Sequence, residues 1–413
     1  MKKFDVKGLY YITHIENLLS ILDRGILSHA RIETLNVPFT PIYDSGIVSK
    51  RKDKSTPDRK SLWDYANLYF QPRNPMMYRV VHEKGKQDLA VVGVVPEVLQ
   101  GREILITDGN AANDPTQFYP SSEGLKMLQK QWKIIQNDWW NDLDGSKRKI
   151  MAECLVPERV EPEHIHSIFV SAHEIKARVE ELVGNRRIPV VPEPHMFFQP
   201  RSRTQIGSNI SLIDGDMFFS NMQTLTISVN LQGIMGKGLA SRAKYQFPDV
   251  YVVYQDACRA KRLTARRPYL YKREASLDQD LADLNLPLST PNAVKWFLLF
   301  ATKRKWREDS RLEDIEGGLE WVKKNFQAEG IQSLAMPALG CGLGNLDWAD
   351  MGPLMCRYLH GIGIPVAIYL PRERKIDSQH LKESYLLPYS AFDYDSGQPP
   401  VSDSPVGLVT RNP

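Results

Sequence analysis

The sequence predicts two domains, an α+β domain followed by an α/β domain with a mixed, mainly parallel sheet between helices. Its 413 residues exceed the roughly 100 to 200 that one domain usually takes. Up to residue 200, short apolar runs mix irregularly with helical stretches. From residue 209 to 390, strand-like and helix-like segments alternate, which favours parallel strands. We expect a linker over 201–208 and a flexible tail over 391–413.

The first domain begins with a strand that becomes a helix at Tyr10 to Gly25. Thr13 and Glu16 have the spacing of a capping box, which predicts that the helix starts there, and Gly25 is placed to end it. An apolar strand is expected at Leu89 to Val95. Further helices are expected at Glu123 to Trp140 and Ala172 to Val183.

The second domain is predicted from apolar runs separated by amphipathic segments. Strands are expected at Leu225 to Val229, Val294 to Phe300, Ile331 to Met336 and Val366 to Leu370, and helices at about Gly238 to Tyr245, Ile315 to Phe326 and Met351 to His360. The stretch before this domain, Val191 to Gly207, holds Pro, Gly and polar residues without periodicity, which predicts the linker.

Composition restricts the class of protein. With 42% apolar and 25% charged residues the chain can bury sizeable cores, so disorder is excluded. No run approaches the roughly 18 apolar residues of a membrane span, and the first residues lack a secretory signal, so we expect a cytoplasmic protein without membrane contact. The four cysteines lack metal-ligand spacing, so we expect no metal.

Basic residues concentrate in one place although the net charge is only +4. The segment Lys50 to Lys60, KRKDKSTPDRK, has six basic and two acidic residues. It is either a solvated loop or one that contacts phosphates.

Two further features of the first domain stand out. The segment Asp64 to Tyr78, DYANLYFQPRNPMMY, mixes aromatic rings with Arg73, which suits base stacking or a core edge. Glu153 stands alone in the apolar run KIMAECLVP, where a carboxylate is costly unless it is paired or functional. Glu153 is therefore the best catalytic candidate on physical grounds, with a paired structural Glu as the alternative.

Two glycine-rich loops follow strands in the second domain. The first is SVNLQGIMGKGLA at Ser228 to Ala240, and the second is PALGCGLGN at Pro337 to Asn345. Glycines let backbone N–H groups approach a phosphate, and a helix start adds a favourable dipole. Either loop alone could be a tight turn, but together they predict a nucleotide site at the carboxyl edge of the sheet.

These two loops, with Asp214-Gly215-Asp216 after an apolar strand, resemble the motifs of the macrodomain, an ADP-ribose-binding fold. The likeness covers about Ile210 to Ser390. The segment Phe300 to Trp306, FATKRKW, is most similar to the DarG type, which removes ADP-ribose from DNA. The resemblance implies that Lys303 is the hydrolytic residue, as a nucleophile or an electrostatic stabiliser. It implies that ADP-ribose contacts Asp216, Asn230, Gly236, Gly238, Gly340, Gly342 and Gly344. For Asn230, a turn-stabilising role is the alternative.

The first domain, over about Gly8 to Phe198, resembles DarT, an NAD-dependent ADP-ribosyltransferase that modifies bases in single-stranded DNA. The likeness rests on Y-x-I-T-H-I-x-N-L, Y-F-x-P-R-x-P-M-x-Y and A-E-x-L-V. It implies that Glu153 and Arg51 are catalytic. It implies an NAD pocket lined by Tyr11, Thr13 and Asn17, and DNA contacts from Lys50, Lys52, Tyr69, Arg73 and Tyr78. The motif departs from the family at Tyr11, where a His that binds the nicotinamide ribose is usual.

The leading hypothesis is therefore a fused toxin and antitoxin, acting as a monomer. The first domain would transfer ADP-ribose from NAD to a base of single-stranded DNA, with thymine implied by the DarG-type partner and guanine as the alternative. The macrodomain would hydrolyse ADP-ribose off the base. Two alternatives stay open: a macrodomain that only binds ADP-ribose beside an inactive DNA-binding or interaction module, and a writer and eraser acting on RNA or protein.

Overall fold

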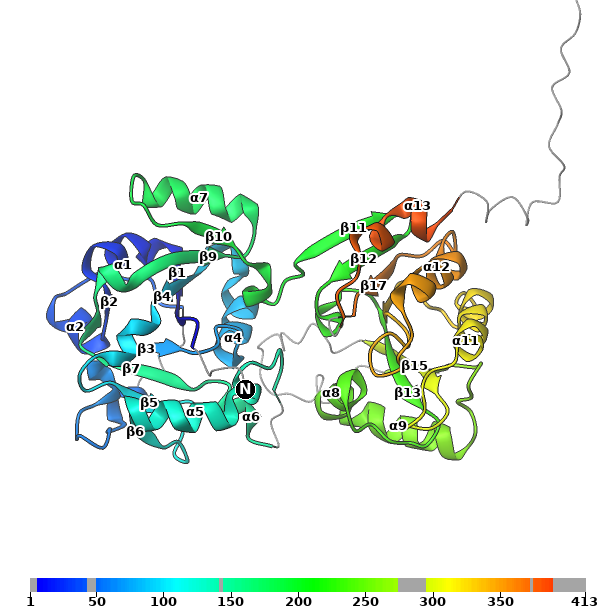
Figure 1. Cartoon of the computed structure of the whole chain (residues 1–413), viewed down its shortest axis with the longest axis horizontal. Helices are drawn as coiled ribbons and strands as arrows, with labels where there is room; N and C mark the ends of the chain where they lie inside the picture. Colours follow the sequence, from blue (N-terminus) through cyan, green and yellow to red (C-terminus); the bar gives the residue numbers. More distant parts are fainter. Residues whose placement is uncertain (1–5, 43–49, 141–143, 274–294, 372–373, 389–413) are drawn as a thin grey trace, which may run out of the picture.

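The computed structural model describes residues 6–42, 50–140, 144–273, 295–371 and 374–388. Within them the chain forms two large sheets, one in each half of the sequence (Figure 1). None of the helices in these ranges is long and apolar enough to cross a membrane. The predicted tail over 391–413 lies outside the described residues.

The first sheet is antiparallel except at one edge, where β10 runs parallel to β9. In spatial order its strands are β10 (Val190–Pro192), β9 (Ile165–Val170), β4 (Leu89–Val94), β1 (Leu9–His14), β3 (Tyr65–Tyr69), β7 (Glu153–Pro157), β5 (Leu105–Thr107) and β6 (Phe118–Pro120). A small ribbon pairs β2 (Ile26–Leu27) with β8 (Arg159–Val160). The helices of this half are α1 (Leu18–Arg24), α2 (His29–Thr34), α4 (Pro75–Lys84), α5 (Ser121–Ile135), α6 (Ser146–Lys149) and α7 (His173–Val183).

Alternation along the strands gives this sheet two apolar faces. Leu9 and Val92 join a core that also includes Leu128 of α5 and Val179 of α7. Ile12 and Val91 point to the other face, where Met77 of α4 packs. The α+β prediction for this half is thus confirmed, with strand β4 and helices α5 and α7 close to their expected ranges.

The second sheet is parallel at its centre and antiparallel at both edges. In spatial order its strands are β11 (Ser202–Ile206), β12 (Ile210–Asp214), β17 (Val366–Tyr369), β16 (Leu334–Pro337), β13 (Thr224–Asn230), β15 (Trp296–Lys303) and β14 (Tyr269–Tyr271). Its helices are α8 (Gly238–Gln246), α9 (Pro248–Arg259), α11 (Leu312–Asn325), α12 (Trp348–Leu359) and α13 (Glu383–Leu386).

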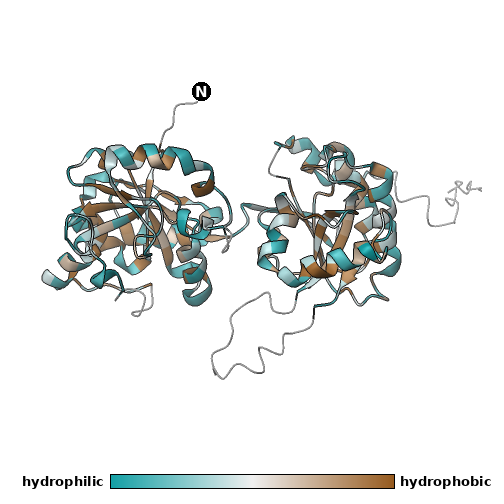
Figure 2. Cartoon of the chain, turned by 90° about the horizontal axis from the view of Figure 1, so that it is seen from below, coloured by the Kyte–Doolittle hydropathy of each residue, from teal (hydrophilic) through white to brown (hydrophobic). Residues whose placement is uncertain are grey.

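Helices cover both faces of this second sheet. Phe300 and Met336 pack with α11 and α12 on one face, whereas Leu299 and Ala335 pack with α8 and α9 on the other. Hydrophobic residues accordingly gather on the strands at the centre of each half, and hydrophilic residues on the helices around them (Figure 2). The prediction of a mainly parallel sheet between helices is confirmed.

Two local predictions were wrong. The predicted linker contains β11, which pairs with β12 along its whole length, because an exposed edge strand of polar residues shows no apolar alternation. The predicted capping box does not form, because β1 extends through His14. A 3-10 turn, η1 (Ile15–Asn17), follows, and the ring of His14 accepts the hydrogen bond from Glu16 N instead. Gly25 does end the helix, with a φ of 83°.

Candidate active sites

The site in the first half is built around a buried ion pair between two segments that lie far apart in the sequence. Glu153, the first residue of β7, has no exposed surface. Arg51 Nη1 donates to its Oε1 at 3.2 Å and Nη2 to its Oε2 at 2.8 Å. The backbone N–H of Ala111 also donates to Oε1, at 2.9 Å. The carboxylate is thus paired and hydrogen-bonded, which is the condition for burying its charge.

Arg51 keeps its charge in this site. Burial acts to lower the pKa of its guanidinium, but the attraction and hydrogen bonding of the Glu153 carboxylate raise the pKa above its ordinary value. The structure therefore brings together the two residues predicted to be catalytic in this half, and fixes their geometry with two parallel hydrogen bonds.

Residues that the sequence did not single out support the pair. Thr107 Oγ1 accepts the backbone N–H of Glu153 at 2.9 Å and so positions the start of β7. His29 stacks on Trp63 with ring centroids 4.3 Å apart. Burial, and then the charge of Arg51, lower the pKa of His29 to about 4. A neutral imidazole therefore lies near the guanidinium, and no sequence pattern marked this isolated His.

The residues predicted to line the NAD pocket lie on β1 and just after it. Burial raises the pKa of Tyr11 to about 12, so its phenol stays protonated. Burial, and then the charge of the Glu153 carboxylate, raise the pKa of Tyr69, the cross-strand neighbour of Glu153. Tyr69 therefore also keeps its proton, beside the Glu153 carboxylate.

Thr13 and Asn17 are joined by a hydrogen bond. Asn17 Nδ2 donates to Thr13 Oγ1 at 3.1 Å and to the carbonyl of Thr40 at 2.9 Å. Thr40 N donates back to Asn17 Oδ1 at 2.7 Å. Thr13 is therefore a partner of Asn17 and not a helix cap, and Asn17 fixes the backbone at Thr40.

The residues predicted to contact DNA divide into two groups. Lys50 and Lys52 are exposed beside Arg51, and Lys52 lies 3.3 Å from Glu33 in a surface ion pair that a phosphate could replace. Tyr69 and Arg73 are buried, and Tyr78 is half-buried. Arg73 is only 1% exposed, so in this arrangement it offers no surface to DNA.

The site in the second half is a cavity of about 600 Å³ at the carboxyl edge of the sheet. It is lined by all eight residues that the sequence assigned to this half, Asp216, Asn230, Gly236, Gly238, Lys303, Gly340, Gly342 and Gly344. Helix α8 begins at Gly238, so its positive end faces the cavity. The volume is within the range of cofactor pockets.

The glycine loops and Lys303 have a defined local geometry. Gly238 and Gly340 have φ values of 59° and 73°, which other residues rarely adopt. Lys303 ends β15 beside Asn230 on β13, and its Nζ donates to the carbonyl of Leu343 in the second glycine loop. The lysine therefore lies next to the first loop through its strand partner Asn230 and is bonded to the second.

Asn230 makes the contacts of a turn-stabilising residue. Its Nδ2 donates to the carbonyl of Ile234 at 2.7 Å, and its Oδ1 accepts from Gln232 N at 2.9 Å and from Tyr254 at 3.0 Å. It thereby shapes the first glycine loop. Tyr254 was not singled out from the sequence.

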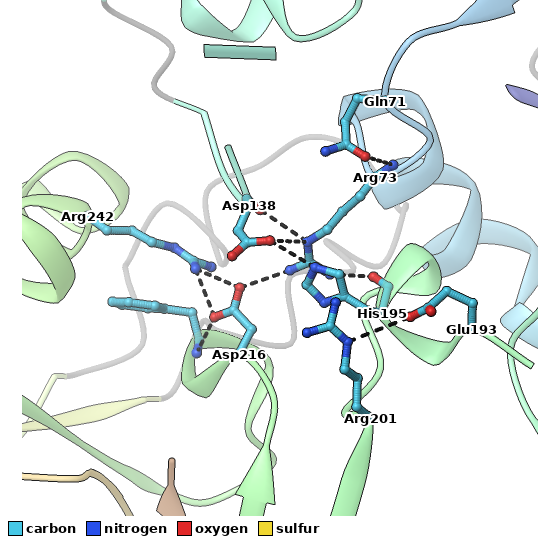
Figure 3. A network of polar contacts seen from close by, with 9 residues as sticks. Gln71, Arg73, Asp138, Glu193, His195, Arg201, Asp216 and Arg242 are labelled. Atoms are coloured by element: carbon cyan, nitrogen blue, oxygen red, sulfur yellow. Dashed lines mark hydrogen bonds and ion pairs between the residues drawn. The ribbon is translucent and has the colours of Figure 1, made fainter. Parts of the chain in front are cut away.

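Asp216 lies at the other end of the cavity, near the first half of the chain. Burial acts to raise the pKa of its carboxyl, but Arg242 and Arg73 hold that pKa below its ordinary value. Figure 3 shows these two guanidinium groups reaching the carboxylate from the two halves of the molecule.

Comparison with known proteins shows the family of the chain. Residues 10–198 match the family model described as ssDNA thymidine ADP-ribosyltransferase, DarT. A DNA ADP-ribosyl transferase-DNA ADP-ribosyl glycohydrolase fusion protein from Thermosipho africanus is 54% identical over 382 residues, which is 92% of this chain and 98% of that protein. The chain belongs to this family of DarT–DarG fusion proteins. The resemblance predicted from the sequence is confirmed.

Two further relatives show how the likeness is distributed. The solved structure of Thermosipho africanus DarTG in complex with ADP-ribose is 53% identical and covers 92% of this chain and 100% of that one, with a TM-score of 0.79. A DNA ADP-ribosyl glycohydrolase from Thermus aquaticus is 31% identical over 40% of this chain and 42% of that protein. The first half of the chain is therefore a DarT-like transferase domain and the second a DarG-like macrodomain.

Proposed function

We propose that the transferase domain attaches ADP-ribose from NAD to a base of single-stranded DNA and that the macrodomain removes it. The observation that carries the proposal is the buried Arg51–Glu153 pair in the domain that matches the DarT model, on a chain 54% identical to a transferase–glycohydrolase fusion protein. Buried ionisable groups with a specific charge partner are often found at catalytic centres.

In the transfer step, the bond between nicotinamide and the ribose C1 of NAD breaks, and its electron pair leaves with nicotinamide. A base nitrogen attacks the resulting oxocarbenium-like carbon, and its proton passes to the Glu153 carboxylate. Arg51 orients that carboxylate through two hydrogen bonds. Thymine is the proposed base, because the matching family model describes a thymidine transferase.

The NAD pocket is proposed to lie beside β1. The phenol of Tyr11 takes the place of the usual His, and as a protonated group it can donate to or accept from a ribose hydroxyl. Thr13 and Asn17 line the nicotinamide end. Lys50 and Lys52, exposed next to Arg51, are proposed to hold the phosphates of the DNA strand.

In the removal step, the macrodomain cavity holds the ADP-ribosyl group, with the glycine loops and the start of α8 around the pyrophosphate. The bond between base nitrogen and ribose C1 breaks, the base regains a proton, and water supplies the hydroxyl at C1. Lys303 is proposed either to stabilise the developing charge or to attack C1 itself. Borohydride added during turnover distinguishes these roles, because it traps a lysine–ribose imine only if Lys303 is the nucleophile.

We place the transferase domain at about residues 1–200 and the macrodomain at about 209–390, to which β11 is added from the former linker. The chain is proposed to act as a monomer, since both steps are assigned to residues of one chain, and to do so in the cytoplasm.

Mass measurement of oligonucleotides tests the proposal directly. Wild type, Glu153→Ala and Lys303→Ala are incubated with NAD and single strands that contain or lack thymine. The Lys303→Ala protein is expected to accumulate modified DNA, wild type little of it, and Glu153→Ala none. Absence of any mass gain with Lys303→Ala contradicts the transferase activity, and a gain on strands without thymine contradicts the choice of base.

A further inference from the structure

The cavity of the macrodomain is partly walled by the transferase domain. Asp138, in the loop after α5, lines the cavity together with Asp216. The ring of His195 holds the Asp138 carboxylate, with Nε2 and Oδ1 2.8 Å apart. A segment of one domain is thus fixed at the end of the other domain's binding site (Figure 3).

The Asp216 carboxylate has both of its oxygens engaged by arginines. Arg242, from α8 of the macrodomain, donates from Nη1 to Oδ1 at 2.8 Å and to Oδ2 at 2.7 Å. Arg73, from the transferase domain, donates from Nη2 to Oδ2 at 3.0 Å. Phe218 N adds a further hydrogen bond to Oδ1 at 3.1 Å. The carboxylate that is expected to face the ADP-ribose is therefore oriented in part by the other domain.

Arg73 is itself rigidly held. Its Nη1 donates to the carbonyl of His195 at 2.8 Å and its Nε to the carbonyl of Asp138 at 3.2 Å. Its guanidinium lies 4.0 Å from the ring centroid of Phe198. The planar guanidinium is thus held by these three contacts, and Arg73 is only 1% exposed. The orientation of Asp216 therefore depends on where the transferase domain holds Arg73.

Arg242 is fixed by both domains as well. Its guanidinium lies 4.2 Å from the ring centroid of Trp139, which belongs to the transferase domain, and 4.2 Å from that of Phe218, which belongs to the macrodomain. Guanidinium groups between aromatic faces gain cation–π stabilisation that increases when water is excluded. Removal of Trp139 would therefore leave Arg242, and through it Asp216, less ordered.

We propose that the ADP-ribose site of the macrodomain is a composite of both domains, in which Arg73 is a positioning residue that presents Asp216 to the ligand. The inference rests on the proposed function, because it takes the cavity to be the ADP-ribose site. It adds to the ADP-ribose site an arginine that a macrodomain on its own does not contain. Arg73 does not take part in bond breaking, so it affects the binding of the ADP-ribosyl group and not the hydrolytic step.

The test uses the full-length chain and two readouts. Calorimetry gives the affinity for free ADP-ribose, and removal of ADP-ribose from a modified oligonucleotide gives KM and kcat. We expect Arg73→Ala to weaken ADP-ribose binding about tenfold and to raise KM by a similar factor, with kcat within about twofold of wild type. Arg73→Lys keeps the positive charge but not the planar guanidinium. Its affinity and KM are expected to lie between those of wild type and Arg73→Ala.

A second variant avoids disturbing the buried arginine. Trp139→Ala leaves both arginines in place and removes the ring under Arg242, which also stacks on Trp140 and meets Phe198 edge-on. We expect it to weaken ADP-ribose binding about threefold. Arg178→Ala is the matched control, because Arg178 is an exposed arginine of the transferase domain paired with Asp88 at 3.0 Å. Thermal unfolding of each variant shows whether the fold is intact.

The outcomes separate the inference from the function on which it rests. If Arg73→Ala and Trp139→Ala bind ADP-ribose as tightly as wild type and Arg178→Ala, the composite site is wrong although the proposed function stands. A loss in kcat without a change in affinity also overturns it. If wild type binds ADP-ribose but leaves modified DNA unchanged, the proposed removal activity is wrong, and the composite binding site is still tested by the affinities.

Discussion

The two sites of this chain are built by opposite means. The transferase site depends on charged side chains, since the half-buried Arg51 and the buried Glu153 hold each other by two hydrogen bonds. The macrodomain site depends on backbone, since two glycine loops and the start of α8 line a cavity of about 600 Å³. We therefore expect the first site to be sensitive to the loss of a charge and the second to the addition of a single methyl group.

The largest expected effect tests the charge dependence of the transferase site. Glu153→Gln keeps the shape of the side chain but removes the group that accepts the proton, so the rate of transfer to single-stranded DNA should fall by about 10²–10⁴-fold. Affinity for ADP-ribose in the macrodomain should not change. Oligonucleotide mass measurement in a Lys303→Ala background gives the rate, and retention of more than a tenth of it would contradict the role of Glu153.

The next effect tests the backbone dependence of the macrodomain site. A Cβ at Gly344 would lie 2.5 Å from the carbonyl oxygen of Gly340, so Gly344→Ala must displace the loop and should cost about 1–3 kcal/mol of stability. Gly236→Ala is the control, because a Cβ there meets its nearest atom at 3.9 Å. Thermal unfolding should separate the two variants, and equal midpoints would show that the second loop is not closely packed.

A smaller effect concerns the residue at which the NAD motif departs from its family. Tyr11→Phe removes one hydroxyl, and if that hydroxyl bonds a ribose the KM for NAD should rise about threefold to tenfold. Tyr119→Phe, on the edge strand β6, is the control. Initial rates at varied NAD concentration give both values. An unchanged KM would mean that Tyr11 only fills space.

The smallest effect is an expected lack of pH dependence. Because Arg242 and Arg73 lower the pKa of the Asp216 carboxyl, the stabilisation that this carboxylate gives is complete above its unfolded pKa of about 3.9 and is lost only as pH falls through the lower, folded value. ADP-ribose affinity should thus be constant from about pH 8 to pH 5. Calorimetry across this range checks it, and a decline beginning near pH 6 would show that the arginines do not hold the carboxylate.

The sequence predicted the parts of the molecule that local patterns determine. The order of strands and helices follows from apolar runs, which lie within short segments. The eight residues around the macrodomain cavity came from the resemblance of short motifs to the macrodomain family. Strand β11 was missed because Ser202 to Gln205 are polar and exposed at a sheet edge. The helix start was misplaced because β1 continues through His14 before the turn.

Contacts between residues that are far apart in the sequence could not be predicted from local patterns. The aromatic residues around Arg73 suited base stacking or a core edge, and the DarT resemblance implied a DNA contact, but the carboxylate partner of Arg73, Asp216, lies in the other domain. Likewise, nothing near Trp139 in the sequence indicates that its ring will stack on Arg242. Such pairs become visible only when the two domains are placed side by side.

The short passage between the domains also has a consequence for stoichiometry. Only residues 198–201 separate η6 (Pro194–Phe197) from β11, and Arg201 N is already bonded to Asp214 O at 2.7 Å. The transferase domain and the macrodomain are parts of one chain and are therefore synthesised in a fixed ratio of one to one. Under the proposed function, the amount of modified DNA in a cell would depend on the two rate constants and on NAD supply, and not on the relative lifetimes of two proteins.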